Sequence, residues 1–167
     1  MHEDLFAQAE ILAKLDPRKP KQANLRRAIS SAYYGIFHFF VDEACRLQFG
    51  TQHAQAAYRH TLGRAFTHSV MKQACISFGG GTLKASVMKG LPHDDSGNYL
   101  IPEAIQDAAS TFVELQEKRS VADYDRTERF KRSDVLIMID QAKSDCANFA
   151  ELCAKTLVIA RRYVLTS

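Results

Sequence analysis

A chain of 167 residues is long enough to build one hydrophobic core, and a single domain over residues 1–167 is expected. Its 46% hydrophobic and 25% charged residues are ordinary for a globular protein, which argues against a disordered chain. The net charge of +3 is too small to identify a nucleic-acid-binding protein by itself.

Helical segments are predicted in chain order, beginning with a short amphipathic helix over about residues 3–15 that ends before Pro17. The next helix covers about residues 22–49 and ends at Gly50, a residue type common at helix C-termini. From residue 26 to residue 40 it reads RRAISSAYYGIFHFF and has no clear polar stripe. Because such a helix is normally surrounded by others, this segment is expected to be the buried centre of the domain.

A third helical segment is predicted over about residues 51–78, ended by three glycines at 79–81. Its apolar residues at helical spacing, which are expected to lie together, are Tyr58, Leu62, Phe66 and Val70. Residues 82–100 are rich in turn-forming residues and exceed the usual length of a connection. They are expected to form a functional or mobile loop.

Two further helices have continuous apolar seams. The first begins near Pro102, a residue suited to a first helical turn, and runs to about Lys118. Its seam consists of Ile101, Ile105, Ala108, Phe112 and Leu115. The last long helix is expected to be capped by Ser133. Its seam consists of Val135, Ile139, Ala142, Cys146, Phe149, Cys153, Leu157 and Ala160. With no strand pattern present, the sequence predicts an all-α fold, an up-and-down bundle of four to five helices.

The N-terminus and the cysteines indicate the cellular compartment. The first residues carry acidic groups in place of the positive charge of a signal peptide, and no apolar stretch reaches the ~20 residues of a membrane span. The four cysteines lack the spacing of zinc sites and are expected to be reduced and mostly buried. A cytoplasmic protein that does not contact a membrane is therefore expected.

Established catalytic and metal-binding motifs are missing from the sequence. It contains no HExxH, GxSxG or Walker-type motif, so a hydrolase or a nucleoside triphosphatase of those classes is not indicated. Residue types that could bind a divalent metal, although nothing fixes their mutual geometry, are His60, His68, His93, Asp94 and Asp95. Neither a metal nor a cofactor is expected.

Arg64 and His68 are four residues apart in the third predicted helical segment, so their side chains are expected to share one face. An arginine can hold a phosphate and stabilise its developing charge, while an imidazole can move the proton of a 2′-hydroxyl near neutral pH. The pair therefore predicts RNA chemistry, although the same pairing also occurs by chance on polar helix faces. Two basic clusters, at residues 18–27 and 126–132, can contact phosphates or form solvated helix ends.

The segment LQEKRSVADYD, residues 115–125, is a second candidate for a functional site. If the helix continues through it, Arg119 and Asp123 lie four residues apart on one face. Asp123 can then pair with an arginine, either Arg119 or Arg26, and Tyr124 can close the end of the bundle. A role of these residues in catalysis or binding is the alternative.

The pattern RRAISSAYYGIFHFF, followed by FVELQEKRSVADYD and a long terminal helix, resembles the HEPN superfamily, the higher eukaryotes and prokaryotes nucleotide-binding domains. It is similar to the bacterial branch with an AYYA-like second helix and an R-x3-DY segment, and the resemblance covers about residues 5–152. It implies a helical bundle that commonly dimerises and is often encoded beside a nucleotidyltransferase in toxin–antitoxin or phage-defence modules. Many members are metal-independent ribonucleases with an Arg-x4–6-His motif.

The resemblance assigns Arg119 to the motif arginine, while Asp123 and Tyr124 stand where the ribonuclease members carry histidine. It thus implies a nucleotide-binding, RNA-binding or partner-binding domain, and its implied partners are a second copy of the chain, RNA or a nucleotide, and a nucleotidyltransferase or antitoxin. The expected ligand-binding residues are Arg26, Tyr33, Arg119, Asp123 and Tyr124. The alternatives are a metal-independent endoribonuclease, with Arg119, His68 and Arg64 as catalytic residues, and a non-catalytic protein-interaction domain.

Overall fold

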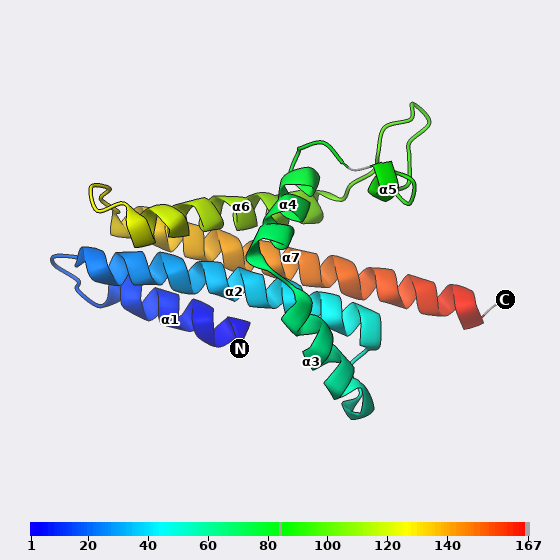
Figure 1. Cartoon of the computed structure of the whole chain (residues 1–167), viewed down its shortest axis with the longest axis horizontal. Helices are drawn as coiled ribbons and strands as arrows, with labels where there is room; N and C mark the ends of the chain where they lie inside the picture. The colour runs from blue at the N-terminus through cyan, green and yellow to red at the C-terminus, as the bar shows by residue number, and fades with distance from the viewer. Residues whose placement is uncertain (84, 166–167) are drawn as a thin grey trace.

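Four long helices lie side by side and form the body of the molecule (Figure 1). They are α1 (His2–Lys14), α2 (Gln22–Phe49), α6 (Glu103–Tyr124) and α7 (Arg132–Leu165). The computed structural model describes residues 1–83 and 85–165, and it describes side chains at residues 1–83, 85 and 87–155. Consecutive long helices run in opposite directions, which confirms the predicted all-α bundle.

Helix α2 is the centre of the bundle, as its lack of a polar stripe predicts. It packs against α1, α6, α7 and also α3 (Ala56–Ala65). Its fully buried side chains include Ile29, Tyr33 and Ile36. A Cβ atom at Gly35 would lie 2.9 Å from Phe6 Cε1, so the missing side chain lets α1 approach α2 closely. The helix ends at Gly50, whose φ of 69° is accessible to glycine, and both predicted ends of α2 are confirmed.

The prediction of one helical segment over residues 51–78 is wrong. The chain forms a short 3₁₀ turn, His53–Gln55, followed by α3 and α4 (His68–Phe78), with an extended backbone at Phe66 and Thr67. These helices cross the bundle in Figure 1. Along the described chain, six helices of ten or more residues therefore replace the predicted four to five.

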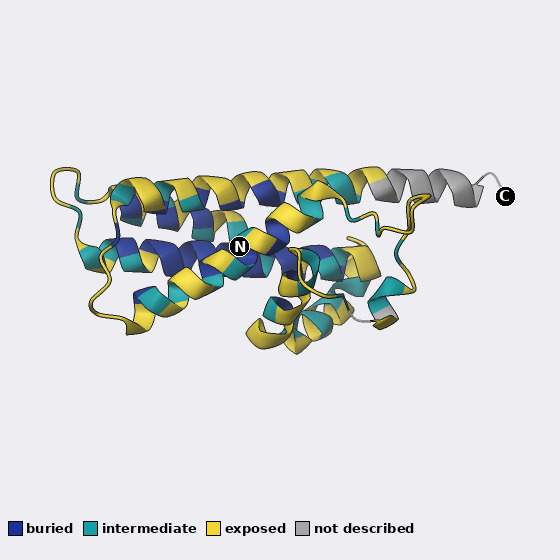
Figure 2. Cartoon of the chain, turned by 90° about the horizontal axis from the view of Figure 1, so that it is seen from above, coloured by how far each residue is buried: buried dark blue, intermediate teal, exposed yellow. Residues whose placement is uncertain are grey.

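The break between α3 and α4 also separates the apolar residues that the helical period groups together. Tyr58 and Val70 are each 62% exposed, while Leu62 and Phe66 pack against the core. No residue of α3 is buried, and Figure 2 shows the buried positions concentrated in the bundle. Because the helical period stops at residue 66, residues before and after it do not share a face.

The predicted seams of α6 and α7 are confirmed at most of their described positions, while Ile101, Ile105 and Cys153 are only partly buried. Their buried residues are Ala108, Phe112, Leu115, Val135, Ile139, Ala142 and Cys146. Helix α6 continues past the predicted end at Lys118 to Tyr124. Helix α7 begins at Arg132, so Ser133 lies in its first turn and bonds to Asp134 instead of capping the helix. The predicted seam positions Leu157 and Ala160 lie outside the residues with described side chains.

The connection between α4 and α6 contains one short helix, α5 (Ala85–Met88), and one isolated antiparallel bridge between His93 and Tyr99. The Asp94 carboxylate accepts hydrogen bonds from the backbone N–H groups of Ser96 and Asn98, which forms the turn between the bridged residues. The segment thus contains local structure that its turn-rich composition does not predict, and its role as a functional or mobile loop stays a prediction.

The cysteines follow the prediction. Cys45, Cys75 and Cys146 are buried free thiols, and Cys153 is a partly buried one. Burial raises the pKa of Cys75 to about 12, so its thiol stays protonated and unreactive near neutral pH. None of the helices in the described ranges has both the length and the apolar character that crossing a membrane requires.

Candidate functional site

Polar and aromatic side chains from α2, α4 and α6 meet at one place on the surface of the bundle. The Tyr33 hydroxyl of α2 lies 2.7 Å from Nδ1 of His68, the first residue of α4. Arg119 of α6 donates from Nη2 to the Tyr34 hydroxyl at 3.3 Å. We refer to Tyr33, Tyr34, His68, Arg119 and Asp123 as the Arg119–His68 site.

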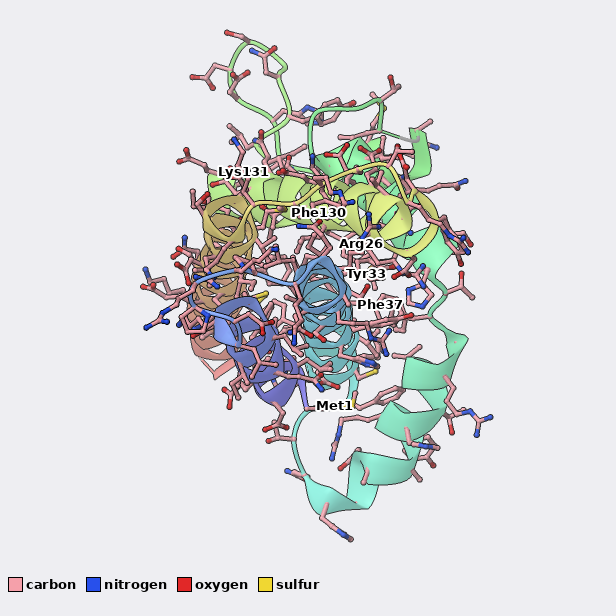
Figure 3. The ribbon with its side chains drawn as sticks, turned by 90° about the vertical axis from the view of Figure 1, so that its left-hand side faces the viewer. Met1, Arg26, Tyr33, Phe37, Phe130 and Lys131 are labelled. Atoms are coloured by element: carbon pink, nitrogen blue, oxygen red, sulfur yellow. The ribbon has the colours of Figure 1, made fainter. Side chains whose placement is uncertain are left out.

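Local sequence places these groups. Tyr33 and Phe37 are four residues apart on α2, and Figure 3 shows Arg26, Tyr33 and Phe37 along the same side of this helix. The Thr67 hydroxyl accepts a hydrogen bond from the backbone N–H of Val70, so α4 starts with His68 in its first turn. The position of the imidazole therefore depends on where the chain breaks between α3 and α4.

The imidazole of His68 lies among aromatic rings. Its centroid is 4.2 Å from that of Phe37, 5.5 Å from that of Tyr33 and 5.8 Å from that of Tyr34. The Arg119 guanidinium carbon lies 5.9 Å and 5.7 Å from the ring centroids of Tyr33 and Tyr34. These distances fit cation–π contacts, which hold the guanidinium near the aromatic surface.

Burial sets the protonation states of the Tyr33–His68 pair. It raises the pKa of Tyr33 to about 12, so the phenol keeps its proton near neutral pH. Burial, followed by the positive charge of Arg119, lowers the pKa of His68 below its ordinary 6.5. The imidazole is therefore mostly neutral at pH 7.

The hydrogen bond with Tyr33 uses only one of the two imidazole nitrogens. Protonated at Nδ1, the imidazole of His68 donates to Tyr33 and its Nε2 is a free base; protonated at Nε2, it accepts from Tyr33 and Nε2 becomes a donor. In both tautomers Nε2 has no partner among the described residues, and His68 is exposed. The nitrogen is thus available to a ligand.

The Arg119–Asp123 pair that the sequence predicts is present. Arg119 Nε lies 2.7 Å from Asp123 Oδ2, and the side chains are 28% and 24% exposed. The Nε–H has no aligned acceptor, so the contact is an ion pair and not a good hydrogen bond. Ser30 donates to the other oxygen of Asp123 at 2.9 Å. Within the described part of the chain, Nη1 of Arg119 has no hydrogen-bond partner.

Arg64 is not on one helix face with His68, and that prediction is wrong. Arg64 belongs to the last turn of α3 and His68 to the first turn of α4, with the extended residues Phe66 and Thr67 between them. Arg64 lines a separate cleft between α2 and α3, together with Arg59. The structure brings His68 to Arg119 instead.

Arg26 is close to the end of α6, but its donors contact backbone. Nη1 donates to the carbonyl oxygen of Ala122 at 2.6 Å, and Nη2 donates to that of Glu128 at 2.7 Å. Its guanidinium carbon lies 5.4 Å from the Phe130 ring centroid. Tyr124 is 77% exposed and does not close the end of the bundle, contrary to the prediction, because it lies on the outer side of the last turn of α6.

Three residues of this region could not be assigned from the sequence. Ser30 bonds Asp123, Phe37 packs against His68, and Gln116 donates to the backbone carbonyl of His68 at 3.4 Å. The only signal is spacing, because Phe37 follows Tyr33 by four positions and Gln116 precedes Arg119 by three. Nothing in the sequence shows that α4 packs against these two helix faces.

No group of three or more metal-ligating side chains comes together among the described residues. The candidate ligands His60, His68 and His93 belong to α3, α4 and the loop before α6, respectively. Comparison with known proteins gives no relative: no family model matches the chain, and no curated protein or solved structure matches it.

Proposed function

We propose that the chain is a HEPN-type domain that binds single-stranded RNA at the Arg119–His68 site, as a component of a toxin–antitoxin or defence module. The observation that carries the proposal is the position of Arg119: its guanidinium lies beside two tyrosine rings and close to a neutral imidazole, at the surface, with Nη1 unpaired in the described chain. A guanidinium held in this way can donate to a phosphodiester.

The aromatic surroundings favour a single strand as the ligand. Tyr34 is partly exposed and His68 is exposed, so their rings are accessible to an unstacked base. Unpaired bases stack on tyrosine and histidine rings, whereas double-stranded RNA is bound mainly through its shape and its 2′-hydroxyl and phosphate groups. A phosphate bound to Arg119, with a neighbouring base stacked on these rings, would use both the charged group and the aromatic surface of the site.

The binding proposal is tested by fluorescence anisotropy with a labelled single-stranded RNA of about ten nucleotides, a typical site size. Arg119→Ala is expected to weaken binding by about tenfold or more, because the variant cannot form the charged hydrogen bond to phosphate. Arg126→Ala, an exposed arginine in the second basic cluster and outside the site, is the matched control and should change the affinity less.

Removal of the Arg119 side chain also leaves Asp123 without its counter-ion, which could repel RNA by itself. The double variant Arg119→Ala/Asp123→Asn removes this repulsion and is still expected to bind weakly. Wild-type affinity in a folded double variant would show that Arg119 does not hold the phosphate and would overturn the proposal.

Metal-independent RNA cleavage is a second candidate function, favoured by one observation. His68 contacts Tyr33 and Arg119 contacts the adjacent Tyr34, so the imidazole and the guanidinium lie in the same site. In this reaction His68 Nε2 takes the proton of the 2′-hydroxyl, and the 2′-oxygen attacks phosphorus. The bond to the 5′-oxygen breaks, and that oxygen takes a proton from the imidazolium, which leaves a 2′,3′-cyclic phosphate. Arg119 would stabilise the charge on the phosphoryl oxygens.

Cleavage is tested with EDTA present and His68→Gln as the variant, since glutamine keeps hydrogen bonding but cannot accept the proton. The candidate predicts 2′,3′-cyclic ends from the wild type, none from His68→Gln, and no cleavage of RNA with 2′-deoxy nucleotides, which should still bind. Cleavage that requires a divalent metal, or that persists in His68→Gln, would rule it out.

A further inference from the structure

The cleft that Arg64 lines, between α2 and α3, is basic and lies next to the Arg119–His68 site. Its volume is about 640 Å³. Its basic lining residues are His38, Arg46, Arg59, His60 and Arg64. The acidic residue in its lining is Asp42, whose carboxylate lies 3.6 Å from His2 Nδ1. The cleft therefore has an excess of positive charge.

The basic side chains of this cleft differ in how they are held. Arg46 is paired with Glu43 at 2.7 Å, so its charge is largely compensated. Arg59 has no carboxylate partner in the described chain, and its Nη1 donates at 2.9 Å to the backbone carbonyls of Gly50 and Gln52. Arg64 and His60 are exposed, and their side chains have no hydrogen-bond or ion-pair partner among the described residues. The rim thus has one fixed guanidinium and two groups free to reach an anion.

The floor of the cleft is apolar. A Cβ atom at Gly63 would lie 3.3 Å from Val41 Cγ1 and 3.7 Å from Cys45 Sγ, so glycine lets α3 pack closely on α2. Cys45 is buried, and its Sγ lies 3.3 Å from the Arg59 carbonyl oxygen. An apolar floor under a basic rim suits an unpaired nucleotide, with its base below and its phosphate at the rim.

His38 connects the cleft with the Arg119–His68 site. It lines the cleft, and its ring centroid is 5.4 Å from that of Phe37, the residue whose ring lies 4.2 Å from that of His68. Positive charge on His38 is close enough to contribute to the lowered pKa of His68. The two sites are therefore neighbours along α2.

We propose that this cleft binds a further nucleotide of the same RNA strand that contacts Arg119, with Arg59, His60 and Arg64 as phosphate-binding residues. The inference rests on the proposed RNA binding and adds the path of the strand over the surface, which runs from α6 across the start of α4 to α3. A phosphate and a base bound at the first site, with a further nucleotide bound in the cleft, would make affinity depend on RNA length.

The test compares a dinucleotide with a single-stranded RNA of about ten nucleotides, in anisotropy competition. The double variant His60→Ala/Arg64→Ala removes two exposed side chains, so it should fold. It is expected to bind the dinucleotide like the wild type and the longer RNA about tenfold more weakly. The affinity of the variant for the longer RNA should also depend less on salt. The slope of log K against log salt concentration should be smaller by about 0.7 for each phosphate that the variant no longer binds.

The matched control is Arg18→Ala/Lys19→Ala, which removes two exposed charges from the connector between α1 and α2, at the other end of the bundle. It should leave the length dependence unchanged. If His60→Ala/Arg64→Ala binds both RNAs like the wild type while Arg119→Ala does not, the cleft proposal fails and RNA binding at Arg119 stands. If the wild type binds neither RNA, the proposed function itself fails.

Discussion

In the proposed function, the carboxylate of Asp123 would set how strongly Arg119 holds a phosphate. It lies 2.7 Å from Arg119 Nε, so it both positions the guanidinium and reduces the positive charge that an RNA strand meets. A partly exposed pair of this kind contributes at most about 1 kcal/mol to the free energy of unfolding. Asp123 is therefore predicted to affect RNA binding more than stability.

Asp123→Asn is predicted to increase RNA affinity by about threefold to tenfold, because the amide keeps the shape of the side chain and removes its negative charge. Anisotropy at low salt measures the change. Asp125→Asn is the matched control: it removes a charge two positions away that is held in a turn by Thr127. An equal gain in both variants would mean that only net charge matters, and weaker binding by Asp123→Asn would mean that Asp123 itself helps to bind the ligand.

Arg26 is predicted to act in stability and not in ligand binding. Its guanidinium bridges the carbonyl oxygens of Ala122 and Glu128, which joins the start of α2 to the end of α6 and the following loop. Arg26→Ala is expected to lower the free energy of unfolding by about 1–3 kcal/mol in urea denaturation. Arg26→Lys should restore little, because one ammonium cannot reproduce the planar fork. Weaker RNA binding with unchanged stability would contradict this role.

At the level of the helices, the break between α3 and α4 decides where His68 lies. Thr67 is the N-cap of α4, and its side chain accepts a hydrogen bond from the Val70 N–H. Without this cap the first turn of α4, which includes His68, is expected to fray.

Thr67→Ala is predicted to reduce the free energy of unfolding by about 1 kcal/mol and to weaken RNA binding in proportion to the disorder of the first turn. Thr61→Ala is the matched control, because the Thr61 hydroxyl bonds to the Ala57 carbonyl inside α3 and caps nothing. Similar effects of the two variants would show that the cap at Thr67 has no special role.

The same break shows what the sequence can and cannot predict. The ends of α2 follow from the apolar pattern and from Gly50, and the buried seams of α6 and α7 follow from helical spacing. The break at Phe66 and Thr67 contains neither glycine nor proline, and the apolar spacing from Tyr58 to Val70 continues through it. Thr67 is the one usable signal, because threonine is a favoured N-cap residue.

The candidate site also has one part that the sequence predicts and one part that it does not. The Arg119–Asp123 pair is local, four residues apart on one helix, and could be predicted from spacing. The bond between Tyr33 and His68 joins two helices across 35 positions of the chain, and it depends on the direction that α4 takes after the break. The residue spacing within one segment does not show in which direction α4 runs. Helical spacing alone therefore pairs His68 with Arg64.

For the molecule as a whole, two histidines link stability to pH: His38, which is partly buried, and His68, which is exposed but packs against the Phe37 ring. Burial lowers the pKa values of both His38 and His68 below the ordinary 6.5. The unfolded chain therefore binds more protons than the folded one below about pH 6.5, and the free energy of unfolding is predicted to fall as the pH is lowered through this range. Well above pH 6.5 neither state binds these protons, and this contribution is constant.

Urea denaturation at about pH 7.5 and about pH 5.5 measures this decrease in stability. The double variant His38→Gln/His68→Gln should show a smaller difference between the two conditions, because neither glutamine titrates. His53→Gln, an exposed position in the turn before α3, is the control and should behave like the wild type. An unchanged pH dependence in the double variant would mean that other groups cause the decrease.

The arrangement of the helices brings the Arg119–His68 site and the neighbouring cleft together around α2. The four-helix body holds α2 and α6 in place, and the crossing helices α3 and α4 bring His68 to Arg119 and Arg64 to the neighbouring cleft. A strand of RNA that spans both sites would contact α6 and the consecutive helices α3 and α4, which precede α6 by more than 20 residues. Any variant that loosens α3 and α4 should therefore weaken RNA binding before it unfolds the bundle.

The most direct test of RNA binding at the Arg119–His68 site is an NMR titration of the histidine rings with a short single-stranded RNA in the presence of EDTA. The ring signals of His68 are predicted to shift on addition of RNA, while those of His93, in the loop before α6, stay in place. Arg119→Ala should abolish the shift at the same RNA concentration. His68 signals that do not move while the RNA is bound would place the RNA elsewhere and contradict the account.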